Sequence, residues 1–329
     1  MQNKLTLRPF GISGLRISEV GFGCGPTGGL MVDGSFKERC EVVARAVRHG
    51  ITLFDTAPVY GHGLSETNLG ETLAALDAPV DIATKVVLSE DDFGDLHGAV
   101  LRSVEESLKR LRRDRVAIVH LHNRVGRERA ARPNIGVGAL LRVDDVLGPV
   151  AEALQSLKRS GTIAAIGCCA FGGEMPAAKD VVESGLFDGV LVNYSALNPS
   201  AFANVPAAVA PDYAQIGLAA ADRNMGIVAL RILEGGALVD GGETTSYRDP
   251  VLLSRFLRNQ SLRTELQAAG LSLKEAATRF ALFDKNVSTA LVGISNLAQL
   301  DEIVTYAGNG PLSAGLKRVL GDAVRDASA

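Results

Sequence analysis

The stretch LFDTAPVYGHGLSETNLG, residues 53–70, contains a short apolar strand, an abrupt polar stop and the start of a helix. The strand ends in Asp55, and the proline- and glycine-rich turn after it carries Tyr60. Ser65 is predicted to cap the following helix, with Glu66 favourably placed in its first turn. A buried strand that stops at a carboxylate and leads into a tight loop places polar side chains at the rim of a sheet, where functional residues usually lie.

The same unit of strand, loop and helix recurs along the chain. The helix predicted at 96–111 has an apolar stripe, and the strands are nearly continuous apolar runs, as expected for strands covered on both faces. Several helices are predicted to end at a left-handed glycine just before a strand, at Gly50, Gly161, Gly185 and Gly226. The predicted strands span residues 20–23, 52–55, 80–85, 116–121, 163–168, 189–193, 227–230 and 289–292.

These repeated units predict an α/β fold, a (β/α)8 TIM barrel, rather than an open sheet. Residues 4–8 and 15–20 predict an N-terminal β-hairpin before the barrel. Composition does not shift along the chain, so residues 1–329 are predicted to form a single domain. Two long connections, 123–142 and 231–271, follow strands and are expected to form binding loops at the C-terminal rim.

Composition limits the classes of function. The chain has 47% hydrophobic and 22% charged residues, a net charge of −3 and a pI near 6.0, so it lacks the basic surface that binds nucleic acid or an anionic membrane. It has neither a long apolar run that could span a bilayer nor an apolar signal-peptide core in MQNKLTLRPF. The four cysteines have no C-x-x-C spacing, which favours free thiols. We therefore expect a cytoplasmic protein whose partners are small molecules; its oligomeric state is left open.

Polar residues follow three successive predicted strands. Asp55 and Tyr60 come after the second strand, Lys85 ends the third, and His122 follows the fourth. Because neighbouring strand ends meet in a barrel, these side chains can converge on one site. A free tyrosine is a poor acid near neutral pH, but a nearby ammonium lowers its pKa, and a carboxylate keeps that ammonium charged. Each residue alone could be structural; together they predict a site of proton transfer, with His122 placing a substrate oxygen.

Two other motifs allow different readings. His120 and His122 lie two residues apart on a strand and so share a face, which leaves a metal site as the less favoured alternative, because the chain's other histidines lie in unsuitable contexts. The glycines of segment 23–28 form a G-x-G-x-x-G string, but Pro26 interrupts it and no helix is predicted before Phe36. A Rossmann site is therefore not predicted, and the glycines instead allow backbone to approach a ligand.

Three segments closely resemble the aldo-keto reductase superfamily. They are FDTAPVYGHGLSE at 54–66, ATKV at 83–86 and SLKRLRRDRVAIVHLHN at 107–123, and the resemblance extends over essentially the whole chain. It implies a (β/α)8 barrel that reduces carbonyls or oxidises alcohols with a nicotinamide cofactor, NADP or NAD. By this resemblance the catalytic tetrad corresponds to Asp55, Tyr60, Lys85 and His122. Tyr60 is then the general acid in reduction and the general base in oxidation.

The resemblance also implies a cofactor site. LVGISNLAQLDE at 291–302 looks like the family's last strand and adjoining helix, which hold the adenosine phosphate end of the cofactor. The implied contacts are Gly23, Cys24, Asp55, Cys169, Asn193, Gly293, Ser295, Gln299 and Glu302. Gly293 and Gln299 stand where basic residues are common, so the preference between NADP and NAD is left open. Cys169, Ala170 and Leu191 replace the usual carboxamide contacts, which leaves Asn193 or backbone groups to hold the nicotinamide.

The predicted function is therefore that of an NAD(P)-dependent oxidoreductase. The loop sequence APVYGHGLSE, residues 57–66, resembles the corresponding loop of family members that oxidise free sugars. This resemblance favours a sugar or another small hydroxylated substrate. A Schiff-base aldolase that uses Lys85 as its nucleophile is one alternative. A non-catalytic regulator that binds nicotinamide nucleotides is another.

Overall fold

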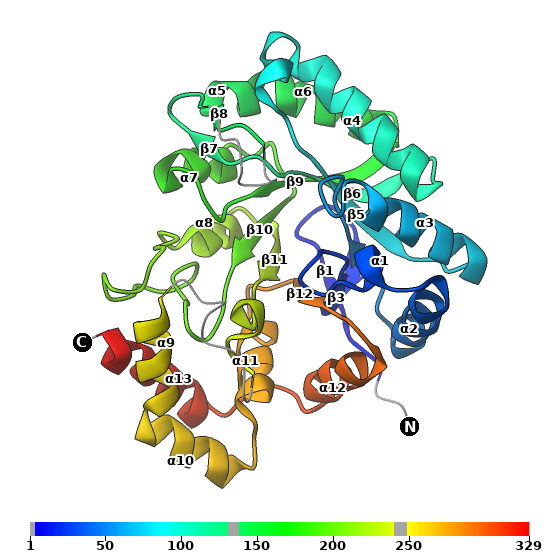
Figure 1. The fold of residues 1–329 in the computed structure, drawn as a ribbon. Helices are drawn as coiled ribbons and strands as arrows, with labels where there is room; N and C mark the ends of the chain where they lie inside the picture. Colours follow the sequence, from blue (N-terminus) through cyan, green and yellow to red (C-terminus); the bar gives the residue numbers. More distant parts are fainter. Residues whose placement is uncertain (1–3, 131–137, 240–248, 329) are drawn as a thin grey trace.

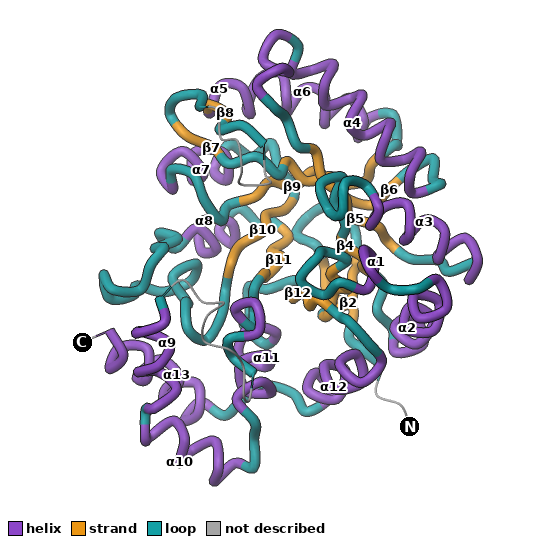
Figure 2. The backbone as a smooth tube through the Cα atoms, viewed as in Figure 1, coloured by secondary structure: helices purple, strands orange, loops and turns teal. Residues whose placement is uncertain are grey.

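The computed structural model, which describes residues 4–130, 138–239 and 249–328, is a closed barrel of eight parallel strands surrounded by helices (Figures 1 and 2). The strands, in their order around the barrel, are β3 (Val20–Gly23), β4 (Leu53–Asp55), β5 (Asp81–Val86), β6 (Val116–Leu121), β9 (Ile163–Cys169), β10 (Gly189–Asn193), β11 (Gly226–Leu230) and β12 (Thr289–Gly293), and β12 pairs with β3. Both ends of each of the eight predicted barrel strands lie within one residue of those observed. The predicted (β/α)8 barrel is confirmed.

Helices of two groups cover the barrel. The first group flanks the strands and comprises α1 (Leu30–Asp33), α2 (Phe36–His49), α3 (Leu64–Leu76), α4 (Leu96–Leu111), α5 (Val143–Asp145), α6 (Ala151–Arg159), α7 (Met175–Glu183), α8 (Ile216–Asp222), α11 (Leu273–Leu282) and α12 (Leu297–Gly308). The second group packs around its own apolar cluster at one corner of the molecule (Figure 1) and comprises α9 (Pro250–Arg258), α10 (Gln260–Ala269) and α13 (Ala314–Ser328). Part of the connection predicted at 231–271 is thus helical.

Several shorter elements complete the described chain. Strands β7 (Val125–Gly126) and β8 (Leu141–Arg142) pair within the other predicted long connection, 123–142. Short 3₁₀ helices span Glu90–Gly94 and Glu234–Gly236, and a π-helical turn spans Val146–Val150. No helix among residues 4–130, 138–239 and 249–328 is long and apolar enough to cross a membrane.

The N-terminal hairpin closes one end of the barrel. Strands β1 (Leu7–Pro9) and β2 (Arg16–Ser18) pair antiparallel, as predicted, and the turn between them carries Phe10, which is fully buried. A Cβ atom on Gly189 or Gly226 would lie 2.1 or 2.2 Å from the Phe10 ring. Because these glycines begin β10 and β11, the phenylalanine fills the N-terminal end of the barrel and leaves the C-terminal end for ligands.

The hairpin also explains why the left-handed conformation predicted for one of the four glycines at helix ends was wrong. Gly50, Gly161 and Gly185 take the predicted left-handed conformation, with φ of 91°, 79° and 76°. Gly226 does not: the left-handed residue after α8 is Asn224, with φ of 54°. Gly226 is glycine because the Phe10 ring occupies the space of a side chain, and a local sequence pattern cannot reveal that contact.

Gly226→Ala should destabilise the chain by about 1–3 kcal/mol, because the added methyl group overlaps the Phe10 ring in a packed interior. Chemical denaturation would measure the loss. Gly321→Ala is the matched control: its nearest neighbouring atom lies 3.9 Å away within α13, and its stability should stay equal or rise by up to about 1 kcal/mol. Equal stability of Gly226→Ala and the native chain would contradict this account of Phe10.

Candidate active site

A cavity of about 340 Å³ opens at the C-terminal ends of the strands. Its lining includes the last residue of each of four strands: Gly23 of β3, Asp55 of β4, Leu230 of β11 and Gly293 of β12. Tyr60, from the turn after β4, lines the same cavity. The stretch 53–70 thus contributes both a carboxylate and a phenol to this space.

The turn that carries Tyr60 is fixed to the strand ends by Ser65. The Ser65 hydroxyl donates to the carbonyl of Cys24 at 2.9 Å and lies 2.8 Å from the Thr56 hydroxyl. The prediction that Ser65 caps α3 was therefore wrong. Gly63, with φ of 89°, takes the N-cap position. Glu66 lies in the first helical turn, as predicted.

Asp55 and Lys85 form a buried ion pair. The Lys85 ammonium donates to Asp55 Oδ1 at 2.5 Å and to the Thr56 carbonyl at 2.8 Å, and the lysine is 1% exposed. Burial alone would lower the pKa of Lys85, but the charge of Asp55, the Tyr60 phenol and the hydrogen bond to Asp55 together raise it. Lys85 therefore stays a cation near neutral pH. The second carboxylate oxygen of Asp55 is buried and has no hydrogen-bond partner among the described residues.

The Lys85 ammonium of this pair lies over the ring of Tyr60. The Lys85 nitrogen is 4.9 Å from the centroid of the tyrosine ring. Burial raises the pKa of the Tyr60 phenol, while the charge of Lys85 acts in the opposite direction and lowers it. The lowering expected from Lys85 is thus present, but burial outweighs it, and the predicted net direction was wrong. Tyr60 is a protonated phenol near neutral pH.

The two histidines of the fourth strand have different surroundings. The rings of His122 and Tyr60 lie edge-on with centroids 6.2 Å apart, and the rings of His122 and Phe171 lie edge-on with centroids 6.1 Å apart. His120 is paired with Lys85 in the β5–β6 register, and its ring occupies the space that a side chain on Gly167 would need. His122 is therefore the histidine beside the phenol. Within the described parts of the chain, no three or more metal-ligating side chains gather.

The surroundings of His122 predict how stability depends on pH. Burial, with the charges of Lys85 and Arg124, lowers the pKa of His122 to about 3, against about 6.5 in an unfolded chain. Between these values the unfolded chain binds a proton that the folded chain excludes, so stability falls as the pH falls. His122→Gln removes this titration. The stability of the native chain relative to that variant should therefore drop by about 2 kcal/mol between pH 7 and pH 5, measured by denaturant unfolding. The same difference at both pH values would contradict the lowered pKa.

Of the predicted cofactor contacts, Gly23, Asp55, Gly293, Ser295 and Gln299 line the cavity. The other four, which are Cys24, Cys169, Asn193 and Glu302, are not part of its lining. Cys24 and Cys169 are buried, at 1% and 4% exposed, and burial raises the pKa of both thiols. The amide nitrogen of Asn193 donates to the Tyr213 hydroxyl at 2.8 Å. Glu302 pairs with Lys274.

Sequence reasoning missed two basic residues that line the cavity. Lys274 comes from the first turn of α11, and Arg231 directly follows β11. Each is paired: Lys274 with Glu302, and Arg231 with Glu234 at 3.5 Å. The sequence offered a signal for Lys274, because a residue in the first turn of a barrel helix lies near the strand ends, and the Ser272 hydroxyl caps that helix by accepting from the Glu275 backbone N–H.

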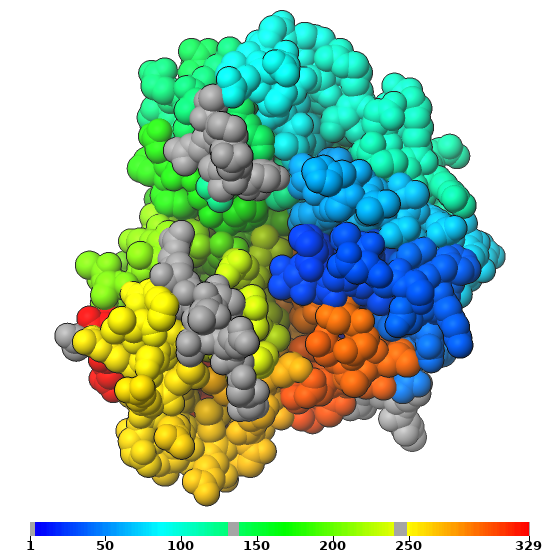
Figure 3. Space-filling model, viewed as in Figure 1, coloured from blue at the N-terminus to red at the C-terminus, as the bar shows by residue number. Residues whose placement is uncertain are grey.

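The segment around α1 forms another wall of the cavity. Thr27 and Gly28 line it, and a Cβ atom on Gly28 would lie 2.7 Å from the Ile294 backbone nitrogen. In the space-filling view the N-terminal surface, in blue, meets the α12 region, in orange (Figure 3). Glycine at position 28 thus allows two loop backbones to touch beside the cavity. The sequence did not predict α1, which begins before Phe36.

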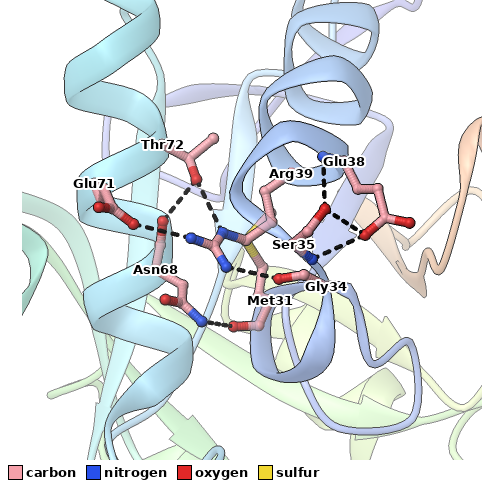
Figure 4. Close-up of polar contacts among 8 residues, drawn as sticks. All are labelled: Met31, Gly34, Ser35, Glu38, Arg39, Asn68, Glu71 and Thr72. Carbon is pink, nitrogen blue, oxygen red and sulfur yellow. Dashed lines mark hydrogen bonds and ion pairs between the residues drawn. The ribbon is translucent and has the colours of Figure 1, made fainter.

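Arg39 fixes the α1 wall to α3. Its buried guanidinium donates to the Gly34 carbonyl at 2.7 Å and to Glu71 at 2.9 Å (Figure 4). Asn68 of α3 adds a hydrogen bond to the Met31 carbonyl at 2.8 Å. These contacts connect the α1 wall to α3, the helix that follows Tyr60.

Comparison with known proteins identifies similar chains. The profile of the Aldo/keto reductase family matches residues 19–315. L-galactose dehydrogenase from Arabidopsis thaliana is 29% identical over 308 residues, covering 92% of this chain and 88% of that protein. D-threo-aldose 1-dehydrogenase from a Pseudomonas species is 26% identical over 331 residues, covering 90% and 91%. The structure of an aldo-keto reductase from Bacillus halodurans, in its holo form, superimposes with a TM-score of 0.71 at 20% identity, covering 97% and 96% of the two chains.

Proposed function

The chain belongs to the aldo/keto reductase family of oxidoreductases, and on this premise we propose that it exchanges a hydride between NAD(P) and a carbonyl or alcohol carbon of a small hydroxylated substrate. One observation carries the proposal. Asp55 and Tyr60 from the end of β4, Lys85 from β5 and His122 after β6 lie close together at the C-terminal rim. A phenol, a buried ion pair and a neutral imidazole beside a cavity form a site suited to proton transfer.

The residues around the cavity fit a nicotinamide dinucleotide. Glycine backbone at Gly23, Gly28 and Gly293 lines the cavity, a buried oxygen of Asp55 is unpartnered within the described chain, and Ser295 and Gln299 stand at the start of α12. Glycine backbone and the helix start suit the phosphates, and Asp55 suits a polar group near the reacting centre. When bound, the nicotinamide supplies or accepts the hydride.

Tyr60 is the proton donor or acceptor in the proposed mechanism. In reduction its phenol gives a proton to the carbonyl oxygen, and in oxidation the phenolate takes one from the substrate hydroxyl. Lys85 stabilises the phenolate through its charge, and Asp55 keeps Lys85 charged and in place. His122, neutral at its lowered pKa, offers a hydrogen bond that places the substrate oxygen next to Tyr60.

The similar proteins suggest the class of substrate. Two of them are named for the oxidation of sugars, L-galactose and D-threo-aldoses. We therefore propose an aldose or a related small polyol as substrate, with residues 1–329 acting as a single domain.

A panel assay tests the proposal. The chain would be mixed with NAD or NADP and a set of aldoses, simple alcohols and aromatic alcohols, and the formation of reduced nicotinamide would be followed by absorbance. We expect turnover with at least one aldose and much less with the aromatic alcohols. Binding of the nucleotides without turnover on any substrate would instead support the regulator.

The aldolase alternative has little support from the site. A Schiff-base nucleophile must lose its proton, but the contact with Asp55 keeps Lys85 charged. Borohydride should therefore fail to trap a carbonyl substrate on the chain. A covalent adduct on Lys85 would favour the aldolase over the oxidoreductase.

A further inference from the structure

Lys274 and Glu302 form an ion pair at one end of the cavity. Lys274 lines the cavity together with Ser295, Gln299 and Ile303, and its side chain is 17% exposed. Its ammonium contacts Glu302 of α12, whose side chain is 44% exposed. The hydrogen bond from Lys274 lowers the pKa of Glu302, so the glutamate is an anion near neutral pH.

The pair leaves little positive charge for a further anion. Arg231 is the other basic residue among the described residues that line the cavity, and it too faces a carboxylate, that of Glu234 at 3.5 Å. A phosphate monoester near neutral pH carries about two negative charges. The Lys274 ammonium has N–H donors besides the one that contacts Glu302, but a phosphate bound to them would lie beside the Glu302 carboxylate, where like charges repel.

We propose that the Lys274–Glu302 pair selects against a phosphate on the adenosine ribose, so that the chain prefers NAD(H) to NADP(H). The inference rests on the proposed function, because it assumes that the adenosine end lies over Ser295 and Gln299. An unphosphorylated ribose is a neutral diol. Its hydroxyls donate hydrogen bonds to the carboxylate of Glu302 and accept one from the ammonium of Lys274, so both charged groups are satisfied without disrupting their pairing.

Isothermal titration calorimetry with NADH and NADPH tests this selection. The native chain should bind NADH more tightly than NADPH. Glu302→Gln removes the repelling carboxylate and frees the ammonium, and should shift the ratio of the two dissociation constants toward NADPH by roughly 10- to 100-fold, as for one hydrogen bond to a charged group. Lys274→Gln leaves the carboxylate uncompensated, and should shift the ratio further toward NADH.

Glu105→Gln is the matched control for net charge. Glu105 pairs with Lys109 on the exposed face of α4, far along the chain from the cavity lining, and its substitution should leave the ratio unchanged. Tighter binding of NADPH by the native chain, or an unchanged ratio in Glu302→Gln, would overturn the inference while leaving the proposed oxidoreductase intact. A native chain that bound neither nucleotide would overturn the proposed function as well.

Discussion

Tyr60→Phe should lower turnover between about 100-fold and 10,000-fold in both directions, which is the usual contribution of a positioned general acid or base. The variant keeps the ring that packs over Lys85 and beside His122 but loses the hydroxyl that transfers the proton. Nucleotide binding should stay close to that of the native chain. The measurements are kcat with the best substrate of the panel, and the dissociation constant of the reduced nucleotide.

Tyr194→Phe is the matched control for Tyr60→Phe. It removes another tyrosine hydroxyl, which donates to Asp284 at 3.0 Å, and should cost some stability but little activity. If Tyr60→Phe retained most of the turnover, Tyr60 would not transfer the proton. A loss of nucleotide binding in the same variant would show that the hydroxyl has a structural role instead.

Lys85→Met should abolish turnover and destabilise the chain by about 3–5 kcal/mol. Methionine is similar in length, but its substitution leaves the Asp55 carboxylate buried without its ammonium partner. The double variant Asp55→Asn/Lys85→Met should regain much of the lost stability, because no charge is then left unpaired, and should stay inactive. Denaturant unfolding and kcat separate these two effects.

Lys109→Met controls for the loss of a paired lysine. Its partners are Glu105 and Glu106, and all three side chains are exposed on α4, so stability should change little. A double variant no more stable than Lys85→Met would contradict the idea that the unpaired carboxylate causes the loss. Activity in the double variant would contradict the role of the ion pair in supporting Tyr60.

Most of the fold could be predicted because its signals are local. Apolar runs mark the buried strands, and the ends of all eight predicted barrel strands matched within one residue, whereas the hairpin strand predicted at 4–8 lies at Leu7–Pro9. The errors came from contacts between distant parts of the chain. The Ser65 hydroxyl was expected to cap its own helix but bonds to Cys24, and Gly226 was expected to end a helix but gives space to Phe10.

The candidate site was predictable where it rests on strand ends and less so elsewhere. Asp55, Lys85 and His122 stand at or next to the ends of three successive strands, and Tyr60 lies in the turn after the first of them, so their convergence could be anticipated. The net direction of the Tyr60 pKa could not, because it depends on how completely the phenol is buried. Lys274 was missed because the far end of the cavity is built from α11, a helix that precedes the last strand, and not from the last strand alone.

The position of Phe10 separates two kinds of change that an engineer would make. The Phe10 ring fills the N-terminal end of the barrel, so we expect side chains there to affect mainly thermal stability. We expect side chains at the opposite rim to affect mainly which ligands bind. Substitutions that improve packing around Phe10, Gly189 and Gly226 can therefore be combined with redesign of the rim. Gly226 and Leu230 stand at opposite ends of β11, roughly 13 Å apart at about 3.3 Å per residue, and the effects of sites that distant should add.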